Sequence, residues 1–197
     1  MNTHAKADTL MGAALAPLDS TRSAGLVIVF SLLIAASAQF AIQIGPIPIT
    51  GQSFAVLLTG ALLGSRLGAA AVIAYLIEGA VGLPFFANGG SGLVRFLGPT
   101  AGYLFAFPAA AFVTGAFAEH GWDKRYHTAV AAMAIGSFII LAGGWAWFAL
   151  LTNTPAVAAF QIAWLPFLPG DAIKILLGAA VLPTGWALLK RKASGER

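Results

Sequence analysis

The stretch FLPGDAIKILLGAAVL, residues 167–182, places an aspartate and a lysine inside a long apolar segment. Asp171 and Lys174 are three residues apart, so in a helix they project from the same face. A charged side chain at the centre of a membrane costs about 2.5–3.5 kcal/mol on biological insertion scales. A charge at this depth is therefore a functional candidate.

The composition around this stretch is typical of a helical membrane protein. Of the 197 residues, 59% are hydrophobic and only 9% are charged, whereas soluble domains average roughly 25% charged residues. The apolar runs are long and continuous rather than alternating, which disfavours a transmembrane barrel. We therefore expect an all-α membrane protein.

Six apolar segments are predicted to cross the bilayer, which needs about 20 helical residues, although the second segment is short and glycine-rich. The predicted spans are 24–44, 51–64, 67–86, 100–118, 127–151 and 171–189. Residues 152–168 contain prolines, so an interfacial or re-entrant piece is expected there instead of a seventh crossing. The predicted domains are a cytosolic N-terminal tail (1–22), a six-span membrane domain (23–189) and a basic cytosolic C-terminal tail (190–197).

The basic residues indicate the topology, because cytosolic flanks collect lysine and arginine. With six spans and the N-terminus inside, only Arg95 and Lys174 fall at the outer side. The cytosolic side then holds Lys6, Arg22, Arg66, Lys124, Arg125, Lys190, Arg191, Lys192 and Arg197. We therefore expect both termini in the cytosol. The formal net charge of +4 then reflects topology and not nucleic-acid binding.

Four charges are not explained by topology. Arg95 lies in a glycine-rich outer loop, where its guanidinium either binds a carboxylate or snorkels to the interface. Asp171 either contacts a ligand or sits as an anion at a helix N-terminus. Lys174 lies one turn deeper and needs Asp171, a ligand anion or both. Glu78, near the middle of the third span, is either a protonated buried acid or the partner of Lys174.

The outer half of the predicted bundle thus combines cations, an anion and neutral hydrogen-bonding groups. Asn88 and Gln52 lie at the same level. The aromatic residues around them are Phe85, Phe86, Phe96, Trp164 and Phe167. This set suits a small, partly apolar ligand with a carboxylate at one end and a polar head at the other.

Several kinds of chemistry are disfavoured. The chain has no cysteine and only three histidines, without an HExxH motif, so neither a metal site nor a cofactor is expected. It has no Gly-Lys dipeptide and hence no phosphate-binding loop of the GxxxxGK[ST] type. If the chain takes part in ATP-driven transport, another chain must bind the ATP.

Three motifs resemble a known family. They are GPIPITGQSFAVLLTGALLGSRLGA (45–69), GLPFFANGGSGLVRFLGPTAGYLFAFP (82–108) and FLPGDAIKILLGA (167–179). In this order they resemble the BioY family, the biotin-specific substrate-capture (S) components of energy-coupling factor (ECF) vitamin transporters. The resemblance implies a multi-pass protein of a prokaryotic plasma membrane that binds biotin near its extracellular face. It also implies a transmembrane coupling protein and two cytosolic ATPase subunits as partners.

The resemblance also implies roles for individual residues. Arg95 is implied to hold the valerate carboxylate of biotin, and Asp171 to accept hydrogen bonds from the ureido N–H groups. Lys174 is implied to contact either the ureido oxygen or the carboxylate. The rest of the expected biotin site is Asn88, Gln52 and Tyr103.

A small-residue motif in the first span is implied to contact the coupling protein. Ser37 and Ala41 are the preferred candidates, and Ser31 with Ala35 is the other pair. The expected function is high-affinity capture of biotin, without enzymatic activity. The alternatives are capture of another small vitamin, an intramembrane enzyme using Asp171 and Glu78, and a structural or assembly protein without a ligand.

Overall fold

The computed structural model describes residues 9–15 and 18–195, so Lys6 and Arg197 lie outside the described residues. The described chain is mostly helical. Its α-helices are α1 (Leu10–Leu15), α2 (Ser20–Ala38), α3 (Gln52–Leu63), α4 (Ser65–Ala80), α5 (Ala101–Glu119), α6 (Tyr126–Thr152), α7 (Ala156–Ala163) and α8 (Leu168–Gly195). Two strands and four short 3-10 helices complete it: β1 (Ala41–Ile44), β2 (Ile47–Thr50), η1 (Ala87–Gly89), η2 (Leu93–Phe96), η3 (Trp122–Lys124) and η4 (Leu165–Phe167).

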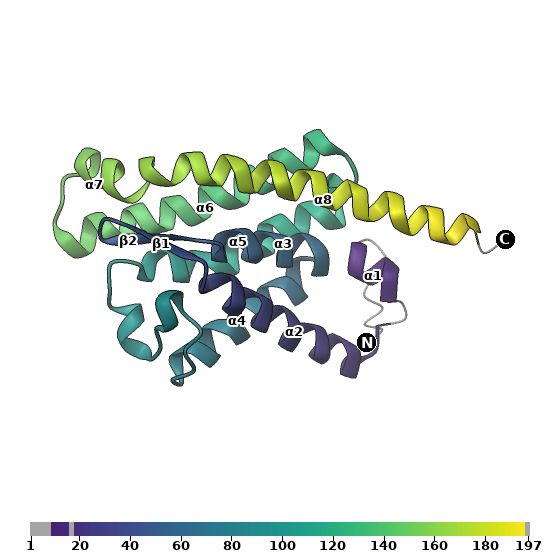
Figure 1. Ribbon diagram of the computed structural model, residues 1–197, viewed down its shortest axis with the longest axis horizontal. Helices are drawn as coiled ribbons and strands as arrows, with labels where there is room; N and C mark the ends of the chain where they lie inside the picture. The colour runs from purple at the N-terminus through teal and green to yellow at the C-terminus, as the bar shows by residue number, and fades with distance from the viewer. Residues whose placement is uncertain (1–8, 16–17, 196–197) are drawn as a thin grey trace.

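Within the described chain, four helical stretches are long and apolar enough to cross a membrane. They are α2, α5, α6 and the stretch Ala156–Arg191, which runs from α7 through most of α8. The helices α3 and α4 coincide with the second and third predicted spans but have only 12 and 16 residues. Figure 1 shows α3 and α5 in the middle of the molecule, with α6 and α8 alongside them. The expectation of a helical membrane protein is thus confirmed.

Glycines allow the central helices to approach closely. A Cβ added at Gly60 of α3 would lie 2.2 Å from the carbonyl oxygen of Ala111 in α5. A Cβ at Gly68 of α4 would lie 2.7 Å from the Cα of Gly60. Close backbone contact at small residues is the usual way in which membrane helices associate.

The first predicted span was too long at its C-terminal end. The helix α2 stops at Ala38, and residues 41–50 form an antiparallel hairpin in which Ala41 pairs with Thr50. Pro46 and Pro48 oppose a helix, and Gly45 takes a φ of +72°, which favours glycine in a tight turn. The all-α expectation is therefore wrong for this segment.

The proline-containing stretch 152–168 forms the short helices α7 and η4. The eight residues of α7 are too few to cross a bilayer. The helix α8 begins three residues before Asp171, which therefore lies in its first turn as expected. It continues through the basic residues that were predicted as a tail.

The hairpin and α7 lie at one end of the molecule, and the C-terminal half of α8 extends toward the other (Figure 1). At that other end, Glu119 accepts hydrogen bonds from the backbone N–H (2.8 Å) and hydroxyl (2.9 Å) of Ser65 and so stabilises the start of α4. Asp123 is buried there and accepts a hydrogen bond from the indole N–H of Trp186. Its other carboxyl oxygen, Oδ1, is buried and accepts no hydrogen bond from the residues that the structure describes.

We predict that Asp123→Asn stabilises the protein at neutral pH. Burial raises the pKa of Asp123 above its ordinary value of 3.8, and the Trp186 hydrogen bond offsets only part of this effect. As the pH rises, the Asp123 carboxyl therefore ionises first in the unfolded chain. The free energy of unfolding falls until the same carboxyl also ionises in the folded protein. The melting temperature in detergent should rise by about 2–4 °C at pH 7.

The gain from Asp123→Asn should fall as the pH drops and disappear well below pH 3.8, where the carboxyl is protonated in both states. Asp19→Asn, at the exposed N-cap of α2, is the matched control because asparagine caps a helix as well as aspartate. An equal gain at both pH values would contradict the prediction.

Candidate ligand-binding site

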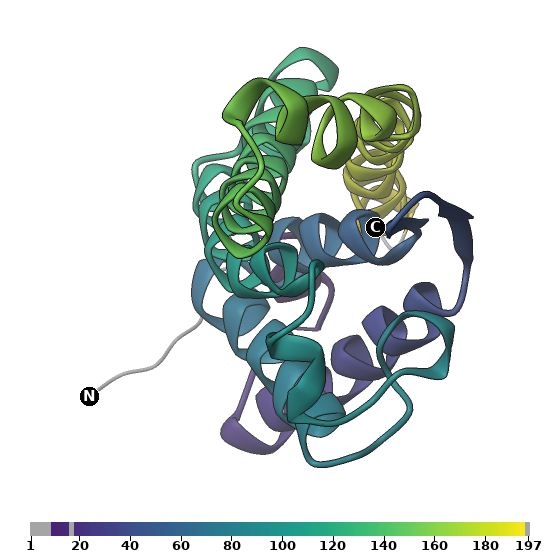
Figure 2. The same ribbon diagram turned by 90° about the vertical axis from the view of Figure 1, so that its left-hand side faces the viewer.

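A cavity of about 650 Å³ opens at the end of the bundle that carries the hairpin. Figure 2 views the molecule from this end. The lining comes from the hairpin, the start of α3, the loop between α4 and α5, and the helices α5, α6 and α8. Its volume is within the usual range for small-molecule sites.

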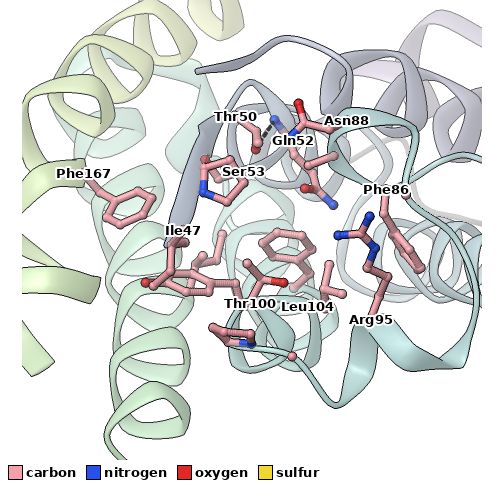
Figure 3. A pocket seen from close by; sticks show the side chains of 18 of the residues that line it. Ile47, Thr50, Gln52, Ser53, Phe86, Asn88, Arg95, Thr100, Leu104 and Phe167 are labelled. Carbon is pink, nitrogen blue, oxygen red and sulfur yellow. Dashed lines mark hydrogen bonds between the residues drawn. The ribbon is translucent and has the colours of Figure 1, made fainter. Parts of the chain in front are cut away.

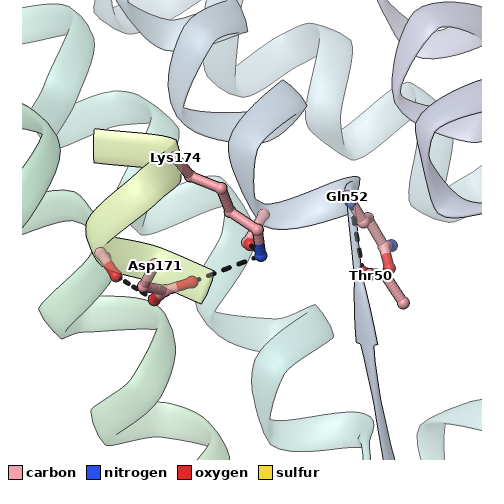
Figure 4. Close-up of polar contacts among 6 residues, drawn as sticks. Thr50, Gln52, Asp171 and Lys174 are labelled. Atoms are coloured by element: carbon pink, nitrogen blue, oxygen red, sulfur yellow. Dashed lines mark hydrogen bonds and ion pairs between the residues drawn. The ribbon is translucent and has the colours of Figure 1, made fainter. Parts of the chain in front are cut away.

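One side of the cavity is polar and is formed by the start of α8. Lys174 Nζ lies 3.3 Å from Asp171 Oδ1 and donates a hydrogen bond of 2.9 Å to Ser53 Oγ of α3 (Figure 4). Ser137 Oγ of α6 donates to Asp171 Oδ2. The pair thus links α8 to two neighbouring helices.

Asp171 is buried but retains capacity to accept hydrogen bonds. A carboxylate has about four lone-pair positions, and the side chains of Lys174 and Ser137 occupy one on each oxygen. Asp171 lines the cavity, so donors of a ligand can reach the remaining positions. This part of the site can therefore accept a hydrogen bond from an N–H donor of a ligand.

A second cation lies elsewhere in the cavity wall. Arg95 comes from η2, and in Figure 3 it lies across the cavity from Phe167. Among residues 9–15 and 18–195, no carboxylate lies within ion-pair distance of its guanidinium. An arginine without a carboxylate partner in a partly apolar cavity is suited to bind the carboxylate of a ligand.

The wall of the cavity also contains a large apolar surface. Tyr103 packs against Phe167 with 5.6 Å between ring centroids, and its hydroxyl donates to the carbonyl oxygen of Ala163. The tyrosine therefore presents its ring more than its hydroxyl to a ligand. The other apolar lining residues include Ile47, Leu104, Phe107, Ile140 and Leu141.

All six predicted ligand residues line this one cavity: Gln52, Asn88, Arg95, Tyr103, Asp171 and Lys174. Their contacts with a ligand stay a prediction. The side-chain amide of Gln52 already donates to the hydroxyl of Tyr75. Asn88 is exposed at the rim in a left-handed conformation, with φ of +57°.

Sequence reasoning missed Ser53 and Ser137, which hold Lys174 and Asp171. A signal for Ser137 was present, because it is the one hydroxyl residue between residues 129 and 151. Ser53 follows Gln52, a predicted ligand residue, but a single uncharged serine is not by itself a signal of a binding site. The pairing of either serine with α8 depends on tertiary structure.

Glu78 does not belong to the cavity. Its Oε1 accepts a hydrogen bond of 3.1 Å from Ser31 Oγ of α2, and its Oε2 is buried without a partner. The alternative that Glu78 pairs with Lys174 is wrong, because Lys174 pairs with Asp171. The carboxyl groups of Glu78 and Asp171 therefore do not meet in one site.

The predicted small-residue motif of the first span is not a helical motif. Ser37 lies on α2, but Ala41 is the first residue of β1, so the two do not share a helix face. The other pair, Ser31 and Ala35, is buried in the bundle.

Comparison with known proteins agrees with the resemblance in the three motifs. A family model described as the BioY family matches residues 5–191. The Probable biotin transporter BioY of Pyrococcus horikoshii is 38% identical, covering 78% of this chain and 89% of the relative. The Biotin transporter BioY of Rhizobium etli is also 38% identical, covering 88% of this chain and the whole relative.

A solved structure described as the S-component for biotin from an ECF-type ABC transporter has the same fold. Its TM-score is 0.75, with 24% identity, and the match covers 86% of this chain and 93% of that one.

We predict that Lys174→Met destabilises the ligand-free protein, because it leaves the buried Asp171 carboxylate without its cation. Adding Asp171→Asn should recover most of the loss. A double-mutant cycle of thermal unfolding in detergent should therefore give a coupling of about 1–3 kcal/mol. Lys190→Met, at an exposed position of the same helix, is the control. A coupling near zero would show that the pair does not stabilise the bundle.

Proposed function

Because the chain belongs to the BioY family, we propose that it captures biotin as the S component of an ECF transporter in the plasma membrane of a prokaryote. The observation that carries this proposal is the polarity of the cavity. A buried carboxylate with two spare acceptor positions lines the same space as a guanidinium that has no carboxylate partner within the described part of the chain. The names of the relatives support biotin as the ligand.

Biotin has a group for each part of the cavity. Its ureido ring carries N–H donors that flank one oxygen, so Asp171 can accept from an N–H while the neighbouring ammonium of Lys174 donates to the oxygen. Its valerate carboxylate pairs with Arg95, and its apolar thioether ring contacts the aromatic wall around Tyr103 and Phe167. Gln52 and Asn88 add neutral hydrogen-bonding groups. In the second arrangement, Lys174 contacts the valerate carboxylate of biotin instead of the ureido oxygen.

We further propose that α2, α3, α4, α5, α6 and α8 are six spans with both termini in the cytosol. The helix ends and turns opposite the cavity carry six basic side chains: Arg22, Arg66, Lys124, Arg125, Lys190 and Arg191. Arg95 and Lys174 lie at the cavity end. This segregation supports a cavity at the extracellular side.

Release of biotin to the cytosol is proposed to require a transmembrane coupling protein and two cytosolic ATPase subunits. The sequence lacks a phosphate-binding loop of its own. Ser37, at the C-terminal end of α2, stays a proposed contact with the coupling protein. An enzyme that uses two carboxyl groups is not favoured, because Glu78 lies outside the cavity.

Purified protein should bind biotin with a Kd below about 1 μM. Asp171→Asn replaces one acceptor oxygen with an amide that repels the ureido donors, so it should weaken binding at least ~10-fold. Asp19→Asn is the control. Failure of wild type to bind biotin, or unchanged binding by Asp171→Asn, would contradict the proposal.

Competition by other vitamins separates biotin from the alternative ligands, and labelled-biotin uptake with and without the ATPase subunits tests the transport step.

A further inference from the structure

The loop between α4 and α5 contains a closed turn whose role was not predicted from the sequence. Phe86 and Gly90 exchange two backbone hydrogen bonds, with N···O distances of 2.9 and 3.1 Å. Between them Asn88 and Gly89 have φ values of +57° and +68°. The turn, residues 86–90, lines the cavity next to Arg95.

Two helices hold this turn in place. The ring of Phe86 is buried and packs over Gly79 of α4, where an added Cβ would lie 2.3 Å from the ring. At the end of α2, Gln39 Oε1 accepts a hydrogen bond of 3.0 Å from the backbone N–H of Gly89. Gln39 Nε2 also donates to the carbonyl oxygen of Phe86 at 3.3 Å. The backbone of the turn is therefore fixed to the bundle.

Gly90 is the point where this fixed backbone meets the arginine. A Cβ added there would lie 2.5 Å from Nε and from Nη2 of Arg95. The φ and ψ of Gly90 are −67° and 152°, which any L-residue adopts without strain. The backbone conformation would therefore accept any residue at position 90. Only glycine, however, leaves the space that the guanidinium occupies. Figure 3 shows the Arg95 side chain beside Phe86 at this side of the cavity.

We infer that Gly90 is a positioning residue that sets where the Arg95 guanidinium lies and thereby gives the site its preference for a carboxylate over a neutral group. The inference rests on the proposed binding of biotin. A methyl group at position 90 needs ordinary contact of 3.4 Å or more, so the guanidinium must move by about 1 Å. All three nearest atoms belong to the flexible arginine side chain, so we expect that side chain, and not the backbone, to move.

The test compares biotin with biotinamide, in which a neutral amide replaces the carboxylate. Both affinities are measured by titration for wild type, Gly90→Ala and Arg95→Ala. In Gly90→Ala the affinity for biotin should fall about 10-fold, because a charge-assisted bidentate contact is misplaced, whereas the affinity for biotinamide should change less than about 3-fold. Gly25→Ala is the matched control, because an added Cβ there meets nothing within 4 Å.

A double-mutant cycle separates positioning from general damage. In an Arg95→Ala background, adding Gly90→Ala should not change the affinity for either ligand further, because the guanidinium that the methyl group would displace is absent. The thermal stability of Gly90→Ala should equal that of wild type. If Gly90→Ala alone does not fold, the inference requires that Arg95→Ala restores folding, and failure to restore it overturns the inference.

The outcomes distinguish the inference from the proposed function. Failure of wild type to bind either ligand would overturn the proposed function and the inference with it. Binding of biotin by wild type, with the same biotin-to-biotinamide ratio in Gly90→Ala, would leave the proposed function standing and overturn the inference. A selective loss for biotin that depends on Arg95 supports it.

Discussion

The ion pair between Asp171 and Lys174 is the contact on which the ligand cavity depends. It lies in the first turns of α8, and its two serine partners come from α3 and α6. Buried charges need partners, because an isolated ionised group in an apolar interior is strongly unfavourable. These three helices must therefore meet at one point, and that point is the polar side of the cavity.

The cavity is built from two structurally different halves. The half around α8 consists of side chains on regular helices, held by hydrogen bonds between helices. The half around Arg95 is a loop, and its geometry comes from the turn 86–90, which α2 and α4 hold. Side chains on helices are positioned by the bundle itself, whereas a loop residue needs dedicated contacts. The contacts of Gln39 and Phe86 meet this need.

Much of the fold and the site could be predicted from the sequence, for identifiable reasons. The apolar runs predicted the helices, and the rarity of charge drew attention to Arg95, Asp171 and Lys174, all of which line the cavity. The hairpin 41–50 was missed in part, because its isoleucines continued the apolar pattern of α2. Polar partners such as Ser137 were missed because hydrogen bonds between distant segments leave no pattern in the sequence. Glu78 could not be assigned a partner for the same reason, and its contact with Ser31 crosses from α4 to α2.

The hairpin has a consequence for how deeply the molecule is immersed in its bilayer. Within the described chain its sheet has only two strands, β1 and β2, so each strand has one outer edge. Hydrocarbon cannot satisfy the peptide groups of such an edge, whereas water and lipid headgroups can. We therefore expect the hairpin to lie at the membrane–water interface. Because its residues also line the cavity, the same constraint would hold the cavity entrance in contact with water, so that a charged solute could enter without crossing lipid.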